Sequence, residues 1–435
     1  AIRASQLGHK VAVIEKENLG GVCLNWGCIP TKSLLKNAEV YQTILKASNF
    51  GINVKDVSFD WKKIISRSRK ISKRLSKGIE YLMKKNKIDV YSGKAKIVDK
   101  NIVEVDKKKF QAKSIIIATG ARAKQFPGVP FDEEKVLTYK DAMSLKKMPK
   151  SISIIGAGAI GVEFAYFYNA FGAKVSIIEA QDRLLPSEDL EVSDLLAKSF
   201  KNAGINLHLS AKVNSIKVKD QVSIDLKDKS IDSDCVLVAI GVQGNFEGLF
   251  SRKIDIDINK GFVSVNEFMQ TKYDNIYAIG DIAGPPWLAH VASAEGVLAV
   301  EHFSREKVQG INYGNIPGCT YCKPEIASIG LTEEKAVSRG YDVAIGRFPL
   351  SASGKAMAVS SPDGFVKVIY DKKYGELLGF HMIGDNATEL ISEIAVARAL
   401  EATNDEILKI IHPHPTLSES IVEATADSKD EAIHI

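Results

Sequence analysis

Two cysteines that stand five residues apart are the sharpest chemical feature of the sequence. Cys23 and Cys28 lie in the segment 20–32, which reads GGVCLNWGCIPTK. The paired glycines before Cys23 and the single glycine before Cys28 free the backbone, so the two residues can approach the ~5.5 Å Cα separation that a disulfide prefers. A regular helix would place them on different faces. The segment therefore favours a reversible redox disulfide over two buried structural thiols.

A second group of reactive side chains stands near the other end of the chain, in His412-Pro-His414-Pro-Thr-Leu-Ser-Glu419. Thiol–disulfide exchange requires a thiolate, and an imidazole with its unperturbed pKa of ~6.5 accepts a thiol proton at neutral pH. A carboxylate such as Glu419 could orient and polarise that imidazole through its far nitrogen. Two histidines and a carboxylate would also suit a metal, but no third strong ligand group stands nearby, so we expect no metal site.

A glycine-rich turn in the middle of the chain has the setting of a nucleotide-binding site. Gly156-Ala-Gly158-Ala-Ile-Gly161 follows the apolar run 151–155, and Glu179 stands 18 residues after Gly161. Such glycines permit a tight turn and a close approach of backbone amides to a pyrophosphate, which the N-terminus of the next helix also attracts. Glycine spacing alone is a weak signal. Placed between a strand and a helix, with a carboxylate at the end of the following strand, it predicts a dinucleotide-binding βαβ unit.

Part of this unit occurs twice. Residues 8–15, Gly-His-Lys-Val-Ala-Val-Ile-Glu, match residues 172–179, Gly-Ala-Lys-Val-Ser-Ile-Ile-Glu, at an offset of 164 residues. In each copy a glycine ends a helix, and a strand then finishes on a carboxylate. The offset places the glycine motif of the first copy before residue 1. We therefore expect a second nucleotide-binding unit near the start of the chain, with its first strand and glycine loop absent.

Further along the chain, three apolar runs end on a glycine, and the last of them continues into Asp281. The runs are 115–120, 236–241 and 276–281. Strands that stop at a glycine let the backbone come close to a ligand at the carboxyl edge of a sheet.

After Pro317 the pattern changes to strand-like runs followed by helical periodicity over 387–400. This change predicts a separate α+β domain that begins near residue 318.

Length and composition fit a globular protein of about three domains. The chain has 435 residues, 45% of them hydrophobic, and its 58 basic and 53 acidic side chains give a formal charge of +5. That charge is too small to indicate a nucleic-acid partner, and no stretch approaches the ~18 uncharged apolar residues of a membrane span. We expect a soluble protein of the cytoplasm, or of the mitochondrial matrix in a eukaryote, without a membrane or nucleic-acid partner.

The positive charge is unevenly distributed. Residues 59–87 hold eleven Lys or Arg against two acidic residues, with apolar residues at helical spacing. We expect a long helix with a solvated basic face, in preference to a docking surface.

Cys319 and Cys322 form a second close pair, which we interpret as two thiols of a strand because no further ligand pair completes a zinc site.

The order and spacing of these motifs over the whole chain resemble the pyridine nucleotide–disulfide oxidoreductase family. Segments 25–32 and 413–419 are most similar to the members that act on lipoamide. The resemblance implies an α/β fold with two Rossmann-like dinucleotide-binding domains, for FAD and for NAD, and a C-terminal α+β dimerisation domain. The implied divisions are 1–126 for FAD, 127–247 for NAD, 248–317 for a central part that completes the FAD domain, and 318–435 for the interface.

The resemblance also implies a reaction and the residues that perform it. A dihydrolipoamide dithiol, borne on a lipoyl protein, would attack Cys23, and Cys28 would contact the flavin. His414, supported by Glu419, would act as the base in the active site of the partner subunit of a homodimer that serves a 2-oxo acid dehydrogenase complex. The implied FAD contacts are Glu15, Lys32, Thr119, Gly120, Gly280, Asp281 and Ala289. The implied NAD contacts are Gly156, Gly158, Gly161, Glu163, Glu179 and Gly241.

Three alternatives share this scaffold. A glutathione-type reductase would place basic residues after Glu179 to hold a 2′-phosphate, whereas Ala-Gln-Asp follows here. A mercuric reductase would need an additional terminal cysteine pair, and residues 432–435 contain none. A non-catalytic subunit of a complex would have no use for the cysteine pair and the histidine–glutamate pair together.

Overall fold

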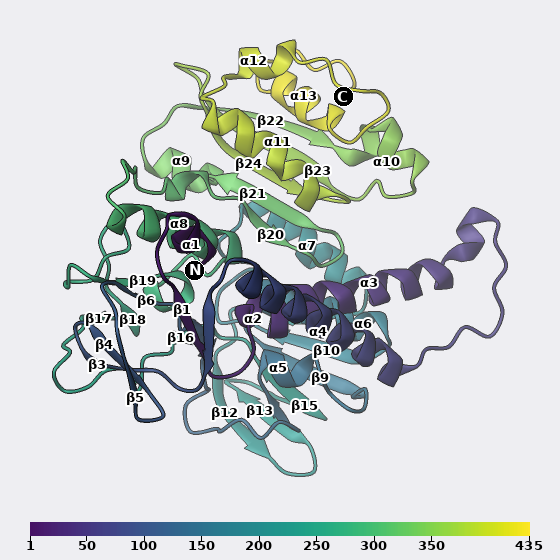
Figure 1. Ribbon diagram of the computed structural model, residues 1–435. Helices are drawn as coiled ribbons and strands as arrows, with labels where there is room; N and C mark the ends of the chain where they lie inside the picture. Colours follow the sequence, from purple (N-terminus) through teal and green to yellow (C-terminus); the bar gives the residue numbers. More distant parts are fainter.

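The computed structural model describes residues 1–435, and the middle of the chain forms a Rossmann-like unit (Figure 1). Its elements are β8 (Val136–Leu137), α5 (Tyr139–Ala142), β9 (Ser151–Ile155), α6 (Ala159–Ala170), β10 (Lys174–Ile178), α7 (Leu190–Asn202), β11 (Asn206–His208), β12 (Val213–Val218), β13 (Val222–Leu226), β14 (Ser230–Ser233) and β15 (Cys235–Val238). Five strands form a parallel sheet in the order β11-β10-β9-β15-β8. Helices α6 and α7 pack on one face and the antiparallel sheet β12-β13-β14 on the other, which is why the apolar strands β9 and β15 are buried.

The N-terminal unit is discontinuous, because residues that follow the middle unit complete it. Its elements are α1 (Ile2–Gln6), β1 (Ala12–Glu15), α2 (Gly21–Trp26), α3 (Cys28–Leu45), the 3₁₀ helix η1 (Ala47–Phe50), α4 (Trp61–Lys85), β2 (Asp89–Ser92), β3 (Lys96–Asp99), β4 (Ile102–Val105), β5 (Lys108–Gln111), β6 (Ile115–Ile117), β7 (Ala121–Ala123), β16 (Val242–Gly244), β17 (Ile258–Asn259), β18 (Phe262–Val263), β19 (Ile276–Ala278), η2 (Gly280–Ala283) and α8 (Ala289–Phe303). β1 pairs in parallel with β2, and β6 pairs in parallel with β19, as two separate sheets. The antiparallel pair β7–β16 connects the chain segments that enter and leave the middle unit.

Helix α4 is the long basic helix that the periodicity predicts. Asp60 caps its N-terminus by accepting a hydrogen bond from the backbone N–H of Lys63, and Trp61 is buried against the aromatic cluster of α6. All but one of its Lys and Arg side chains are exposed, and the exception, Arg69, stacks on Trp26. The helix packs along α2 and α3 and so holds the cysteine segment in place.

The C-terminal unit is built around an antiparallel sheet. Its elements are η3 (Tyr313–Asn315), β20 (Gly318–Thr320), β21 (Ile326–Gly330), α9 (Glu333–Ser338), β22 (Val343–Pro349), η4 (Leu350–Ala352), α10 (Gly354–Ala358), β23 (Phe365–Asp371), β24 (Leu377–Ile383), α11 (Ala387–Ala399), α12 (Asn404–Lys409) and α13 (Glu419–Asp427). The strand order is β20-β21-β24-β23-β22. A hydrophobic core joins this sheet to α11 and α13. The predicted fold class, α/β with an α+β unit at the C-terminus, is confirmed.

A buried ion cluster joins the C-terminal and middle units. The ammonium of Lys367 on β23, 1% exposed, lies 2.9 Å from Asp189, 2.6 Å from Glu191 and 2.7 Å from Glu333. Burial opposes ionisation of Asp189, but Lys367, His381 and the backbone N–H of Glu333 together outweigh this effect, and the pKa of the carboxyl is lowered. Because a buried charge that loses its partners is strongly destabilising, these contacts fix how the two units sit against each other.

The fold also bears on two further expectations from the sequence, one about membrane-spanning helices and one about Cys319 and Cys322. No helix of the chain is both long enough and apolar enough to cross a membrane. Cys319 lies in β20, whereas Cys322 lies just after that strand and not within it, and both are free thiols.

Candidate active site

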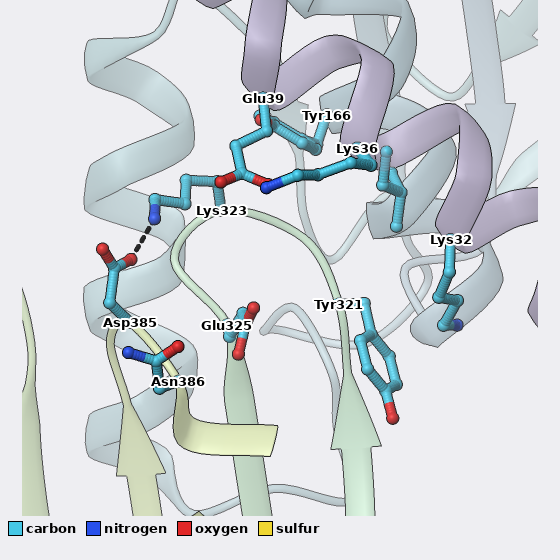
Figure 2. A pocket seen from close by; sticks show the side chains of 10 residues that line it. Lys32, Lys36, Glu39, Tyr166, Tyr321, Lys323, Glu325, Asp385 and Asn386 are labelled. Carbon is cyan, nitrogen blue, oxygen red and sulfur yellow. Dashed lines mark hydrogen bonds and ion pairs between the residues drawn. The ribbon is translucent and has the colours of Figure 1, made fainter. Parts of the chain in front are cut away.

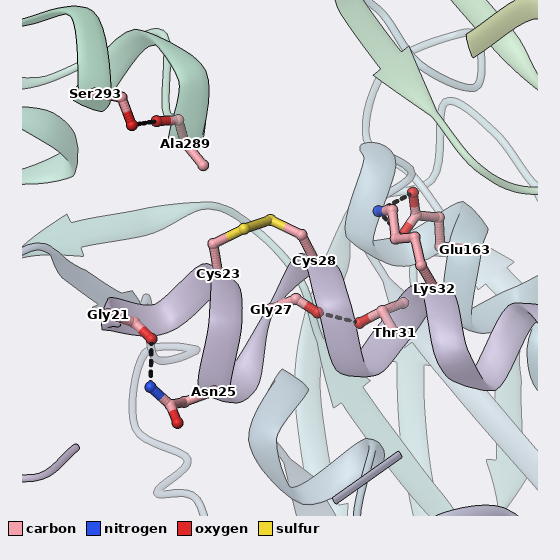
Figure 3. Close-up of a disulfide and its surroundings, with 10 residues drawn as sticks. All are labelled: Gly21, Cys23, Asn25, Gly27, Cys28, Thr31, Lys32, Glu163, Ala289 and Ser293. Atoms are coloured by element: carbon pink, nitrogen blue, oxygen red, sulfur yellow. Dashed lines mark hydrogen bonds and ion pairs between the residues drawn. A yellow bond between two sulfur atoms is a disulfide. The ribbon is translucent and has the colours of Figure 1, made fainter. Parts of the chain in front are cut away.

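The Cys23–Cys28 disulfide sits where one helix ends and the next begins (Figure 3). Gly27 closes α2 and precedes α3, and the resulting break in the helix brings the two Cα atoms to 4.7 Å. A Cβ at Gly27 would lie 3.1 Å from the Cα of Cys23, so a larger residue would crowd the backbone at this break. The predicted pairing of Cys23 with Cys28 is present.

One turn after Cys28, the side chain of Lys32 reaches across to the middle unit. Its ammonium lies 2.9 and 3.0 Å from the two carboxylate oxygens of Glu163, which is 5% exposed on α6 (Figure 3). The backbone N–H of Tyr321, in the C-terminal unit, donates to Glu163 Oε1 at 2.9 Å. The structure thus brings together two of the residues expected at the cofactors, and it adds a third that no sequence motif indicated.

The glycine-rich turn at 156–161 is shaped by close backbone contacts. Gly156 has a φ of +103°, and a Cβ there would lie 2.3 Å from the carbonyl oxygen of Ala239. A Cβ at Gly161 would lie 2.0 Å from the carbonyl oxygen of Gly156, which makes glycine necessary where α6 approaches the strand. Gly158 forms the N-cap of α6 without a side-chain hydrogen bond, so the first backbone N–H groups of this helix are free to bind a phosphate.

Glu179 closes the same turn. Its carboxylate accepts hydrogen bonds from the backbone N–H of Ala157 at 2.8 Å and from that of Gln181 at 2.9 Å. The first copy of the repeat has the same local geometry, because Glu15 accepts from the backbone N–H of Glu17 at 2.8 Å. Both carboxylates end parallel strands, where the ribose of a dinucleotide is bound in this type of fold. These glycines and carboxylates fit the groups of NAD and of an adenosine that they are expected to hold.

Four of the expected flavin contacts, Thr119, Gly120, Gly280 and Asp281, follow the ends of β6 and β19, and Gly241, an expected NAD contact, lies beside the first two. Thr119 donates through its hydroxyl to the carbonyl oxygen of Asn245 at 2.7 Å, and Asn245 donates from its backbone N–H to the carbonyl of Gly120 at 2.9 Å. Gly241 lies in the left-handed region with a φ of +109° before β16. Thr119, Gly120 and Gly241 therefore lie near the antiparallel link between the two nucleotide units.

Asp281 and the start of α8 form the other side of this region. Burial raises the pKa of Asp281. Helix α8 begins at Ala289 with no side-chain cap, which leaves its first backbone N–H groups available to an electronegative ligand atom. Glu295 was not indicated by any motif, yet its carboxylate, 5% exposed, accepts from the backbone N–H of Gly280 at 2.6 Å. A half-buried acid and an uncapped helix start fit the polar ribityl and ring edges of a flavin.

His414 and Glu419 form a pair on the surface of the C-terminal unit. The Nδ1 of His414 lies 2.8 Å from Glu419 Oε1, and the side chain of His414 is 79% exposed. Burial opposes ionisation of Glu419, but the backbone N–H of Thr416, which donates at 2.8 Å, and the imidazole lower the pKa of this carboxyl. The Nε2 of His414 has no partner in the chain and faces outward as a free proton acceptor.

The structure distinguishes His414, the predicted base, from its neighbour His412. His412 uses both ring nitrogens, one with Glu393 at 2.6 Å and the other with the carbonyl oxygen of Ile410 at 3.2 Å, and its side chain is only 7% exposed. Only His414 retains a free nitrogen. Within one chain, no hydrogen bond or ion pair joins His414 to the cysteine segment, and Figure 1 shows α13 on the outer side of the C-terminal sheet, away from α2 and α3.

A small polar pocket lies beside Lys32, between α3, α6 and the C-terminal unit (Figure 2). Its volume is about 190 Å³. Its cations are already paired: Lys36 with Glu39 at 2.9 Å, and Lys323 with Asp385. The lining residues are Lys32, Leu35, Lys36, Glu39, Tyr166, Tyr321, Lys323, Glu325, Asp385 and Asn386.

Comparison with known proteins assigns the chain to the family that its motifs resemble. Residues 1–296 match the family described as pyridine nucleotide-disulphide oxidoreductase, and residues 316–425 match its dimerisation domain. The dihydrolipoyl dehydrogenase of Zymomonas mobilis is 46% identical, with 100% of this chain and 96% of the relative aligned. That of Bacillus subtilis is 44% identical with the same coverage.

Solved structures agree in fold. LpdA from Mycobacterium tuberculosis superimposes with a TM-score of 0.91 at 25% identity, over 98% of this chain and 96% of that chain. The HOCl-induced flavoprotein disulfide reductase RclA from Escherichia coli gives a TM-score of 0.88 at 27% identity, with the same coverage. The redox disulfide, the two nucleotide units, the dimerisation domain and the similarity to curated relatives lead to one conclusion. The chain belongs to the pyridine nucleotide-disulphide oxidoreductases, and within that family to the dihydrolipoyl dehydrogenases.

Proposed function

We propose that Cys23, Cys28, His414 and Glu419 perform the oxidation of dihydrolipoamide to lipoamide. The observation that carries this proposal is the Cys23–Cys28 disulfide one helical turn from the Lys32–Glu163 ion pair, at the junction of the three units. A substrate thiolate attacks the Sγ of Cys23, and the Cys23–Cys28 bond breaks to leave Cys28 as a thiolate. The second substrate thiol then displaces Cys23 and closes the cyclic disulfide of lipoamide, so two electrons remain on the cysteine pair.

FAD and NAD are the cofactors of this enzyme. When bound, FAD would accept the electron pair of the reduced cysteines, and NAD would accept it in turn as hydride. The residues that would hold FAD are Glu15, Lys32, Thr119, Gly120, Gly280, Asp281 and Ala289. Those that would hold NAD are Gly156, Gly158, Gly161, Glu163, Glu179 and Gly241.

The base in this scheme comes from the second subunit. The match to the family's dimerisation domain supports a homodimer as the functional unit. His414 lies on that domain with an exposed, free Nε2, and its own chain offers it no substrate thiol. The partner's disulfide completes the site: Nε2 takes the thiol proton, while Glu419 holds Nδ1 and stabilises the imidazolium.

Replacing Glu419 with glutamine should slow the dithiol half-reaction about tenfold and leave flavin-to-NAD transfer nearly unchanged. The amide keeps the size of the side chain but loses the charge that orients His414 and favours its protonated form. Rapid-mixing spectra follow the two half-reactions separately. Glu423, which pairs with His434 at 2.7 Å, supplies the matched control as Glu423→Gln. Equal slowing of both half-reactions would contradict the orienting role of Glu419.

The enzyme should prefer NAD over NADP by at least about tenfold in kcat/KM, or ~1.4 kcal/mol. The carboxylate of Glu179 accepts hydrogen bonds from a ribose 2′-hydroxyl but repels a 2′-phosphate. Steady-state kinetics with both nucleotides measure this ratio, and Glu179→Ala should narrow it. A wild-type preference for NADP would refute the role assigned to Glu179.

The partners and domain limits follow from the same proposal. The dithiol would arrive on a lipoyl-bearing protein of a 2-oxo acid dehydrogenase complex. The domains would be residues 1–126 for FAD, 127–247 for NAD, 248–317 for the part that completes the FAD domain, and 318–435 for the interface. Separate sheets support this division.

A panel of substrates tests the proposal against its alternatives. Dihydrolipoamide with NAD+, glutathione disulfide with NADPH, and Hg(II) with NADPH are each offered to the purified FAD-loaded protein. Turnover of the first pair, with the other two at or near background, is the expected result. A faster reaction with either NADPH pair would assign the site to another branch of the family, and no turnover with any pair would favour a non-catalytic subunit.

A further inference from the structure

We propose that Tyr321 is a positioning residue that fixes the ammonium of Lys32 and thereby sets the positive charge next to the flavin. The inference rests on the proposed function, in which Lys32 lies beside the flavin. Tyr321 belongs to none of the sequence motifs, and it comes from a different unit from either member of the Lys32–Glu163 pair. Its contacts with both members are what single it out.

The contacts form a closed group of three residues. The Nζ of Lys32 lies 4.2 Å from the centroid of the Tyr321 ring, and it also lies 2.9 and 3.0 Å from the two carboxylate oxygens of Glu163. The backbone N–H of Tyr321 donates to the same carboxylate at 2.9 Å. Figure 2 shows Tyr321 and Lys32 together at one end of the polar pocket. The ammonium of Lys32 therefore contacts both an anion and an aromatic face.

A lysine needs this second contact to stay in one place. Its four-carbon stem has large rotational freedom, and the side chain of Lys32 remains 31% exposed. Glu163 is 5% exposed and fixed on α6, so it defines one side of the ammonium position. A cation over an aromatic face gains an attraction equivalent to about a two- to thirtyfold change in occupancy of that position. The ring thus contributes enough to decide where the ammonium lies.

The ring acts as a neutral aromatic face. Burial, together with the nearby Cys319 and Glu163, raises the pKa of Tyr321 to about 12. The phenol therefore keeps its proton at physiological pH, and it offers Lys32 a ring quadrupole and not a phenolate. Replacing tyrosine with phenylalanine should for this reason preserve the contact, whereas removing the ring should abolish it.

The three residues come from three different parts of the molecule. Lys32 lies on α3, Glu163 on α6, and Tyr321 between β20 and β21. The charge beside the flavin therefore depends on how the C-terminal unit sits against the two nucleotide units. Since a nearby cation stabilises the electron-rich reduced flavin, a loosened Lys32 should make the flavin harder to reduce.

The test compares Tyr321→Leu with Tyr321→Phe in FAD-loaded homodimers. Both variants keep the backbone N–H that donates to Glu163, so they differ in the ring alone. Tyr321→Leu should lower the flavin midpoint potential by the equivalent of a three- to tenfold shift in the ratio of reduced to oxidised flavin, about 15–30 mV for a two-electron couple. It should lower kcat and leave the KM for dihydrolipoamide unchanged. Tyr321→Phe should match the wild type in all three quantities.

Two further variants keep the outcomes separate. Lys32→Met should shift the potential in the same direction as Tyr321→Leu and at least as far; no shift in this variant would refute the position of Lys32 beside the flavin, and with it that part of the proposed function. A shifted Lys32→Met with an unshifted Tyr321→Leu would overturn the positioning role alone. An equal shift in Tyr321→Phe and Tyr321→Leu would also overturn it, because the hydroxyl and not the ring would then matter. If Tyr321→Leu does not retain flavin, Tyr321→Met, an unbranched side chain without a ring, gives the same comparison.

Discussion

Replacing His414 with alanine is expected to slow reduction of the Cys23–Cys28 disulfide by dihydrolipoamide about 10²- to 10⁴-fold, the usual contribution of a positioned general base. The imidazole is prepared for this role, since Glu419 holds Nδ1 at 2.8 Å and Nε2 is free. Anaerobic rapid mixing with dihydrolipoamide measures the rate. Reduction of the bound flavin by NADH should be nearly unchanged, because that half-reaction needs no thiol proton acceptor.

A matched control for this variant exists in the same unit. His434 is also a surface histidine paired with a carboxylate, with its Nδ1 2.7 Å from Glu423. His434→Ala should therefore leave the dithiol half-reaction close to the wild-type rate. If the rate of disulfide reduction were lowered no further by His414→Ala than by His434→Ala, another group would take the proton and the assigned role of His414 would be wrong.

Mixing a Cys23→Ser protein with a His414→Ala protein is expected to restore activity that neither variant has alone. If the base acts across the dimer, the heterodimer has one site in which an intact disulfide meets an intact histidine. Random exchange of subunits makes half of the dimers hybrid, so recovery should reach about one quarter of the wild-type activity. Lipoamide-dependent formation of NADH, followed as subunits exchange, measures the recovery.

The control mixture for this experiment combines Cys23→Ser with Cys28→Ser. Both lesions fall in the disulfide, so the heterodimer contains no intact site and should stay inactive. Subunit exchange itself is confirmed by native mass spectrometry of differently tagged chains. Complete exchange without recovered activity in the first mixture would show that His414 does not act in trans.

Local sequence chemistry was sufficient to predict the elements that depend on spacing. Glycines at fixed positions indicate where the backbone makes a tight turn or a close contact. Gly161, which lies against the carbonyl oxygen of Gly156, and Gly27, where α2 ends, are two examples. The repeat was equally informative, because Glu15 and Glu179 accept the same hydrogen bond two residues on. Helix α4 was predictable since its apolar residues recur at helical spacing over many turns.

Contacts between distant segments could not be predicted in this way. Tyr321 carries no motif, and it reaches Glu163 only when units that are far apart in the sequence pack together. Glu295 also carries no motif, and its contact with the backbone of Gly280 depends on how α8 folds back on the end of β19. Lys367 reads as an ordinary strand residue, although it is 1% exposed in a cluster of three carboxylates. The assignment of His414 came from the resemblance, whereas the contact that occupies the neighbouring His412, the one with Glu393, is a tertiary contact that no motif indicates.

The redox role of Cys23 and Cys28 is tested most directly by following the two cysteines chemically during one turnover. The FAD-loaded homodimer is mixed anaerobically with dihydrolipoamide, quenched with a thiol-alkylating reagent and mapped by mass spectrometry, with and without a chase of NAD+. Dihydrolipoamide should make Cys23 and Cys28 alkylatable, and a chase of NAD+ before the quench should return them to the unlabelled disulfide as NADH appears. NADH formation while Cys23 and Cys28 stay unlabelled throughout, or labelling of the pair that NAD+ does not reverse, would contradict this redox role.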